Sequence, residues 1–341
     1  MKKKIFKIVQ TVAFIGLGLF LIVYFWGKLS TKEQSDIVNN FRDANYFWII
    51  LALLVGVISH ILRAARWNLL IETFDKPPTI WQTFWSVMAG YLANLAVPRL
   101  GEFTRCGLLS KQSKISFDKL LGSVVAERTF DMLVYLLLFA TSIAVFYSTL
   151  KTYLNEKVFK GFNEKFASMS VTKIIVILIV GTLLIFVFFW ILRYFREKPF
   201  IQKVRKIVRN LINGVLSIFK LRRAGLFFLY TLGIWIMYWL MVYLVYFSLP
   251  ATSNLPPESA FIVMIYGTIG IILIQGGIGI YPIIVSEVLI IYGTSLADGY
   301  AIGWLSWSVQ TAMILIMGLL AFIMVSTNKK KTNGLPETDI R

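Results

Sequence analysis

Charged side chains interrupt the apolar stretches of this sequence in two short clusters. Both clusters combine arginine with carboxylate. The first cluster consists of Asn94, Pro98, Arg99, Gly101, Glu102 and Arg105. The second consists of Glu127, Arg128 and Asp131. Ionisable residues at such places usually pair with one another or mark the path of a transported group. Charges three positions apart share a helix face, so we expect Glu102 to pair with Arg99 or Arg105. The same spacing predicts that Arg128 pairs with Asp131.

The first cluster has the features of an anion-binding site. A short helix that begins near Pro98 would leave its first backbone amides free and partly positive, which suits a phosphate. Arg99 and Arg105 add full positive charges, so a phosphate or lipid headgroup is the expected ligand. The alternative is an ion cluster that satisfies itself at the cytoplasmic surface. The second cluster has a similar alternative, because acids at the start of a helix also stabilise the helix dipole.

A third feature is a broken apolar stretch from Ile271 to Glu287. Its candidate site residues are Gln275, Gly276, Gly277, Gly279 and Glu287. Glycine permits positive φ, and the proline that follows removes a backbone donor, so a continuous helix is not expected. Non-helical chain inside a membrane occurs only within protein or beside a water-filled cavity, and such breaks mark binding sites in transporters. The alternative is tight helix packing at small residues.

The composition places these features in an all-α polytopic membrane protein. Of the 341 residues, 57% are hydrophobic and only 15% are charged, whereas soluble proteins are about 25% charged. Apolar segments of membrane-spanning length recur along the whole chain, so we expect one integral membrane domain over 1–341. About six full spans are predicted, at 5–27, 46–70, 121–147, 172–192, 225–248 and 300–326. Two further stretches, 81–104 and 259–292, are broken and fit re-entrant hairpins or pairs of short helices.

Composition also argues against several other classes of protein. The chain has one cysteine, Cys106, and one histidine, His60, so neither an intrachain disulfide nor a cysteine or histidine metal site is expected. We expect no cofactor and no nucleic-acid partner, because the basic residues behind the net charge of +18 flank the spans instead of forming a soluble basic module. His60 is expected to be an interior histidine whose hydrogen-bonding groups are satisfied. Arg63 and Arg66 are expected to reach from the end of their span to lipid phosphates.

The distribution of lysine and arginine predicts the topology. With the N-terminus inside, 26 of the 35 basic residues fall in the cytoplasmic segments 1–7, 63–80, 99–119, 193–223 and 329–341. The outside segments 28–46, 148–173 and 249–300 hold eight. Cytoplasmic loops collect basic residues, so both termini are expected on the cytoplasmic side of the cell membrane.

This layout divides the chain into two similar halves. Each half, 1–148 and 172–326, has two spans, a broken element and one further span, with an outside loop 149–171 between them and a tail 327–341. Three crossings in each half predict an inverted-topology repeat with a site between the halves. The alternative is a chance pair of hairpins. The segment 193–223 has the pattern of a basic amphipathic helix on the inner leaflet.

The three motifs together resemble the flippase-like transmembrane family, which includes the membrane domain of lysylphosphatidylglycerol synthases. The resemblance covers about 5–326 and implies movement of modified phospholipids or lipid-linked sugars between leaflets. It also implies that the two charged clusters and the glycines at 276–279 line the route. Many members carry proline before the paired glycines and Arg-Glu after them, whereas this chain has Gln275 and Tyr281-Pro282, with the acid delayed to Glu287. The soluble aminoacyl-transferring domain of the synthases is absent from this sequence.

The expected function is therefore lipid translocation, with an anionic phospholipid or lipid-linked headgroup as the partner. One alternative is a secondary transporter of a small anionic solute. Another is a membrane-embedded lipid-modifying enzyme with Glu102, Glu127 or Asp131 as general base. No set of catalytic residues is evident in the sequence, so we do not expect the protein to be an enzyme. The sequence leaves open whether copies of the chain form a homo-oligomer.

A cysteine-accessibility scan tests the inverted arrangement. In a Cys106→Ser background, single cysteines at 93–104 are expected to react with a membrane-impermeant thiol reagent applied from the cytoplasmic side. Cysteines at 276–287 are expected to react from the outside. If both ranges are labelled from the same side, the inverted arrangement is wrong.

Overall fold

A computed structural model describes residues 16–17, 19–97, 99–154 and 221–332. These residues form helices and no strands, which confirms the all-α class of the polytopic membrane protein. The chain folds as two compact units, residues 1–142 with 220–341, and residues 143–219. Of the second unit the structure describes only residues 143–154, which form the end of one helix.

Three helices in the described part are long and apolar enough to cross a membrane: α3 (Tyr46–Ile71), α10 (Ala224–Tyr246) and α13 (Leu296–Thr332). They match the predicted spans 46–70, 225–248 and 300–326. The predicted span 121–147 lies within α6 (Phe117–Leu154), which is one continuous helix. The predicted span 172–192 lies outside the described residues, as do most of 5–27 and of the basic segment 193–223.

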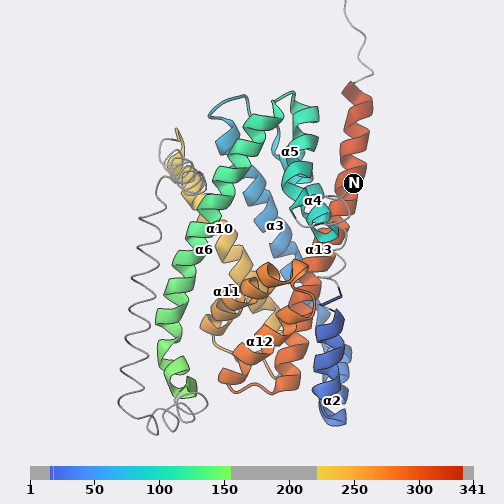
Figure 1. Ribbon diagram of the computed structural model, residues 1–341, viewed down its shortest axis with the longest axis vertical. Coiled ribbons are helices and arrows are strands. Elements are labelled where there is room, and N and C mark those ends of the chain that lie inside the picture. The colour runs from blue at the N-terminus through green and yellow to red at the C-terminus, as the bar shows by residue number, and fades with distance from the viewer. Residues whose placement is uncertain (1–15, 18, 98, 155–220, 333–341) are drawn as a thin grey trace, which may run out of the picture. The chain divides into compact units, whose positions relative to one another are not determined.

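Both broken stretches fold as a pair of short helices that pack against each other. The first pair is α4 (Ile80–Ala96) and α5 (Leu100–Ser113), and the second is α11 (Pro257–Leu273) and α12 (Ile280–Ile291), joined through the 3-10 turn η2 (Gln275–Gly277). The longest of these helices, with 17 residues, extends about 25 Å, less than the ~30 Å hydrocarbon core of a bilayer. Figure 1 shows α4 and α5 in the upper part of the unit and α11 and α12 in the lower part.

Local backbone geometry explains where each hairpin breaks. In the first, Arg99 has a left-handed φ of 61°, and the Asn94 side chain accepts the Gly101 N–H at 2.7 Å. In the second, Gly276 and Gly279 have φ values of 71° and 76°, which glycine adopts without steric cost. Trp307 of α13 donates its indole N–H to the Gly276 carbonyl at 2.7 Å. Each break is therefore held by a side chain that satisfies a backbone group freed by the turn.

Helix α13 contacts both hairpins and so fixes them in one unit. It packs against α4 and α12, and also against α3 and the short helix α2 (Thr31–Asp43). At Gly303 an added Cβ would lie 2.5 Å from the Cα of Pro282 in α12, and at Gly318 it would lie 2.6 Å from the Cβ of Leu92 in α4. Small residues allow this close approach of helices.

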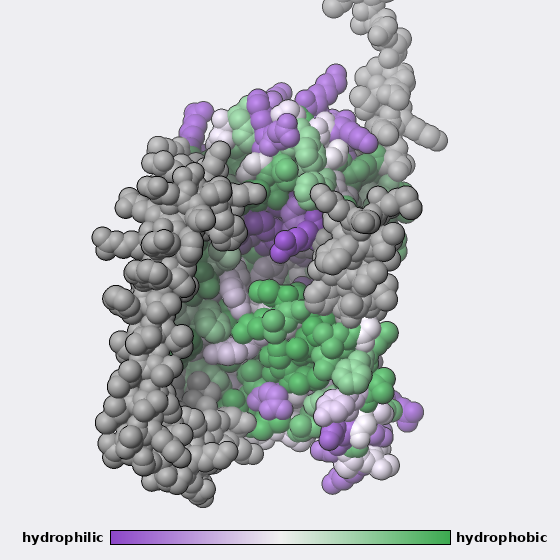
Figure 2. Space-filling view, viewed as in Figure 1, coloured by the Kyte–Doolittle hydropathy of each residue, from purple (hydrophilic) through white to green (hydrophobic). Residues whose placement is uncertain are grey.

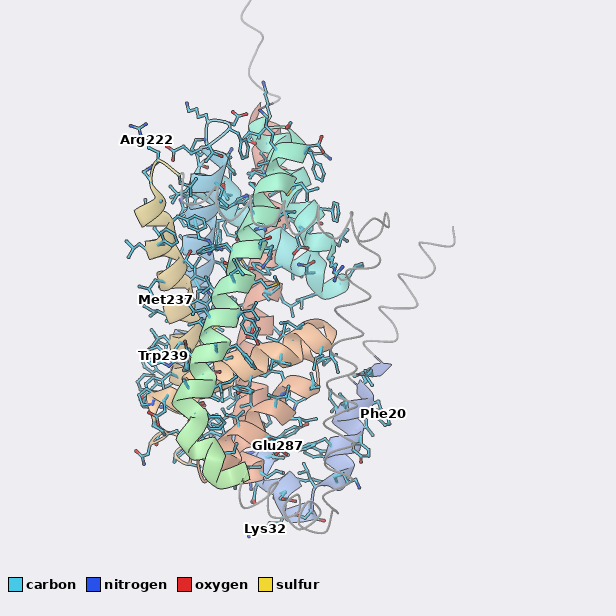
Figure 3. The ribbon with its side chains drawn as sticks, turned by 60° about the vertical axis from the view of Figure 1, so that its left-hand side comes forward. Phe20, Lys32, Arg222, Met237, Trp239 and Glu287 are labelled. Atoms are coloured by element: carbon cyan, nitrogen blue, oxygen red, sulfur yellow. The ribbon has the colours of Figure 1, made fainter. Side chains whose placement is uncertain are left out.

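A predicted cytoplasmic segment and a predicted outside segment lie at opposite ends of the unit. Figure 3 places Arg222, just before α10, and Lys32 of α2 at opposite ends. Arg222 belongs to the predicted cytoplasmic segment 193–223, and Lys32 to the predicted outside segment 28–46. Which end faces the cytoplasm stays a prediction, as does the inverted repeat.

The close contact between α4 and α5 makes Gly101 a sensitive position. A Cβ at Gly101 would overlap the Gly90 carbonyl and lie 2.6 Å from the Asn94 side chain. We expect Gly101→Ala to lower the stability by about 1–3 kcal/mol because the helices must separate. Unfolding of the purified protein in mixed detergent micelles measures the change.

Gly107 provides the matched control on the same helix. An added Cβ there would meet no atom within 4 Å, so Gly107→Ala is expected to leave stability unchanged or to raise it by up to about 1 kcal/mol through helix propensity. An equal loss of stability in Gly101→Ala and Gly107→Ala would contradict the tight packing of α4 against α5.

Candidate functional site

A cleft of about 860 Å³ lies where the two hairpin breaks meet. Residues of both breaks line it, with Asn94, Leu95, Val97 and Arg99 on one side and Ile271, Ile272, Leu273 and Gly276 on the other. The breaks are in direct proximity, because a Cβ at Gly276 would lie 3.7 Å from the side chain of Leu95. The cleft therefore brings together two parts of the sequence separated by more than 170 residues.

The walls of the cleft differ in chemistry. Arg99, Glu102 and Arg128 give it charge, and Asn94, Gln310 and Thr311 add neutral polar groups. Other lining residues are large, apolar and open to the surface: Phe103 is 53% exposed, Ile272 68% and Leu273 57%. Figure 2 shows hydrophilic side chains set in a recess on this face, with a broad hydrophobic area below them.

Behind the cleft, the carboxylate of Glu127 is fully buried among three arginines. One oxygen accepts from Arg63 at 2.9 Å and from Arg66 at 3.1 Å, and the other accepts from Arg105 at 3.1 Å. Asp131, one turn along α6, pairs with Arg63 at 2.9 Å and with Arg66 at 2.7 Å. Buried charges are stable only when paired in this way. We call these five residues the inner ion network.

Neutral groups complete the network. Arg63 donates to the Tyr238 hydroxyl at 3.2 Å, and Arg66 donates to Thr231 at 3.1 Å, both on α10. The guanidinium of Arg105 stacks over the Trp67 ring, 4.7 Å from its centroid. The inner ion network with these partners therefore ties together α3, α5, α6 and α10.

The charged pairs predicted from sequence spacing are wrong. Glu102 pairs with Arg128 on α6 at 3.5 Å, not with Arg99 or Arg105. Arg99 lies in the break with a left-handed backbone and so does not share a helix face with Glu102. Arg128 likewise does not pair with Asp131, whose partners come from α3. Glu102, Arg128 and Asp131 each pair with a residue of a neighbouring helix.

The interpretation of Arg63 and Arg66 as residues that reach to lipid phosphates is also wrong. Their side chains are 6% and 0% exposed, and both belong to the inner ion network. A signal was present in the sequence, because the apolar stretch continues through Trp67 to Ile71 beyond the arginines. His60 is buried as expected, with its ring centroid 4.7 Å from that of Tyr91. The expectation that its ring is satisfied is wrong at Nδ1, which has no hydrogen-bond partner among the described residues.

The structure separates the predicted site residues into three groups. Those that line the cleft are Asn94, Arg99, Glu102, Arg128 and Gly276. Those in the inner ion network are Arg105, Glu127 and Asp131. Those that shape the hairpins are Gly101, Gly277 and Gly279.

Three predicted site residues remain: Glu287, Pro98 and Gln275. Glu287 is exposed on α12 and does not line the cleft; Figure 3 shows it in the same half of the unit as Lys32. The reason is geometric, because α12 carries Glu287 two turns away from the break. Pro98 lies outside the described residues, and Gln275 is described only as part of the η2 turn. The described residues contain no group of three metal-ligating side chains.

Removal of the Glu127 charge should destabilise the protein strongly. We expect Glu127→Gln to cost about 3–5 kcal/mol, because it leaves three buried arginines without their shared counter-ion. Glu102→Gln is the matched control: its side chain and that of Arg128 are 25% and 37% exposed, so about 0–1 kcal/mol is expected. Unfolding in mixed micelles measures both, and equal stability of the two variants would disprove a structural role for the network.

Comparison with known proteins agrees with the resemblance seen in the sequence. The profile of the lysylphosphatidylglycerol synthase TM region matches residues 11–318. No curated protein matches the chain, and no solved structure does. The match covers most of the chain, including both hairpins and the inner ion network. The chain therefore belongs to the family of the lysylphosphatidylglycerol synthase transmembrane region.

Proposed function

We propose that this protein moves a phospholipid or a lipid-linked headgroup between the two leaflets of the membrane. Membership of its family supports a role in lipid handling. The observation that carries the finer proposal is the cleft itself, in which two arginines lie beside apolar residues that are open to the surface. A lipid needs both features, because its headgroup must enter a polar site while its tails stay in an apolar environment.

The balance of charge around the cleft favours an anionic headgroup. Five arginines gather at the cleft and the inner ion network, whereas the carboxylates there are Glu102, Glu127 and Asp131. A phosphate would offset the excess positive charge. Guanidinium groups bind phosphate oxygens through paired, charge-assisted hydrogen bonds. Arg99 and Arg128 are the arginines that line the cleft.

The pair between Arg128 and Glu102 suits exchange with a ligand. Its atoms are 3.5 Å apart and its side chains are partly exposed, and such pairs contribute about 0–1 kcal/mol. A headgroup phosphate can therefore replace Glu102 on Arg128 at small cost. The chain shows no ATP-binding motif, so we propose that a gradient or mass action drives the movement.

The apolar edge distinguishes this proposal from transport of a small anionic solute. Such a solute needs no opening toward lipid, whereas Phe103, Ile272 and Leu273 give the cleft an exposed hydrophobic margin. This margin supports a lipid with tails that remain outside the cleft.

Transport in proteoliposomes tests the proposal. The purified protein is reconstituted with a panel of phospholipids and prenyl-linked lipids, and leaflet exchange is followed with a membrane-impermeant headgroup reagent. We expect Arg128→Ala to slow exchange by about tenfold or more, because a charge-assisted hydrogen bond is worth ~1.5–3 kcal/mol. Arg128→Lys is expected to retain part of the rate.

Arg42→Ala is the matched control, since Arg42 is an exposed arginine on α2 that lines neither the cleft nor the inner ion network. It should exchange lipids at the wild-type rate. Failure of the wild-type protein to accelerate exchange of any lipid in the panel would disprove translocation. Uptake of a free anion would instead identify a solute transporter, and a mass change in the lipid would identify an enzyme.

A further inference from the structure

A second cavity adjoins the cleft. It has a volume of about 220 Å³, and four residues line both spaces: Tyr91, Arg128, Ile271 and Gln310. These four residues form a neck between the cleft and the second cavity, which we call the inner chamber. The cleft and the inner chamber are therefore adjacent spaces that share part of their walls.

The inner chamber contains hydrogen-bond donors that no group of the described residues satisfies. The Nε atoms of Arg63 and Arg128 and the hydroxyl of Ser306 are buried without a hydrogen-bond partner among the described residues. All three residues line the inner chamber. Unsatisfied buried polar groups are rare in proteins and need an explanation such as water or a ligand. Donors from two arginines and a hydroxyl suit the oxygens of an anion.

The rest of the inner chamber wall is mainly aromatic and apolar, with Trp235, Met264 and Tyr281 among its residues. Pockets for whole drug-sized ligands usually measure about 300–1,000 Å³, so a volume of 220 Å³ has room for a small headgroup but not for acyl chains. An occupant with a phosphate would place its charge at the arginines and keep its tails outside.

We infer that the inner chamber is a second binding station for the phosphate-bearing headgroup, reached from the cleft through the neck. This inference rests on the proposed function. Arg128 lines both spaces, so its guanidinium can hold the phosphate while the headgroup passes the neck. The Nε of Arg63 and the Ser306 hydroxyl then donate hydrogen bonds to the phosphate. The other nitrogens of Arg63 are held by Glu127, Asp131 and Tyr238.

Two tryptophans allow the stations to be observed separately. Trp307 lines the cleft and Trp235 lines the inner chamber. The full chain is labelled with 5-fluorotryptophan. The fluorine resonances of Trp307 and Trp235 are identified among those of the ten tryptophans by their loss in Trp307→Phe and Trp235→Phe. Titration with dihexanoyl phosphatidylglycerol is expected to shift both resonances. A parallel titration with inorganic phosphate distinguishes a site for lipid from one for the free anion.

A blocking variant connects the inner chamber to transport. Ser306→Phe places a ring in the inner chamber, and we expect it to abolish the Trp235 response and slow leaflet exchange by about tenfold or more. The Trp307 response should persist, because the cleft is untouched. Leu319→Phe is the matched control on the same helix, since Leu319 is 58% exposed and lines neither space; both resonances and the exchange rate should match the wild type.

The outcomes separate this inference from the proposed function. If the wild-type protein exchanges lipid and Trp307 responds while Trp235 is silent, the inner chamber holds only water and the inference is wrong. Exchange at the wild-type rate by Ser306→Phe overturns it as well. A response to phosphate but not to the lipid shows a solute site and removes both proposals, as does a wild-type protein that neither binds nor exchanges lipid.

Discussion

The burial of one carboxylate, Glu127, sets the geometry on which the cleft depends. An unpaired carboxylate or guanidinium in a low-dielectric interior would cost several kcal/mol, so Glu127 and the three arginines require one another, with Asp131 as a second counter-ion for Arg63 and Arg66. Its partners Arg63, Arg66 and Arg105 come from α3 and α5. Because the charges are tolerable only when all of them meet, the helices that carry them can pack in one register alone. The pair between Arg105 and Glu127 fixes the position of α5 relative to α6.

The same helices also supply the charges of the cleft. Glu102 lies one turn before Arg105 on α5, and Arg128 is next to Glu127 on α6. Helix α5 therefore directs Arg105 into the inner ion network, α6 directs Glu127 and Asp131 into it, and each helix has one further charge at the cleft. The buried charges have short contacts and almost no exposure, whereas the pair between Glu102 and Arg128 is longer and partly exposed. Fixed charges thus position exchangeable ones, which is what a binding site for an anionic headgroup needs.

The sequence predicted best those features that depend on residues close together along the chain. Spans such as 46–70 follow from hydropathy, and the breaks near Gly276 and Arg99 follow from residues that disfavour a continuous helix. Pairings between helices were not predictable, because the partner of Arg128 depends on how α5 packs against α6 and not on spacing within α6. The ion-pair partners of Arg63 were missed for the same reason, although the apolar residues that follow it in the sequence indicate its burial. The inverted repeat also stays a prediction, since its second half requires the span 172–192, which lies outside the described residues.

The forces that hold the two hairpins are unequal. The α4–α5 hairpin is fixed through Arg105 in the inner ion network. The described contacts that hold the α11–α12 hairpin are of a different kind, such as the hydrogen bond from Trp307 to Gly276, that from Tyr135 to the Ile265 carbonyl and the close packing of Gly303 on Pro282. Each such hydrogen bond contributes about 0.5–1.5 kcal/mol, whereas separation of a buried ion pair costs about 3–5 kcal/mol. Contact for contact, the α11–α12 hairpin is therefore held by weaker polar interactions than the α4–α5 hairpin.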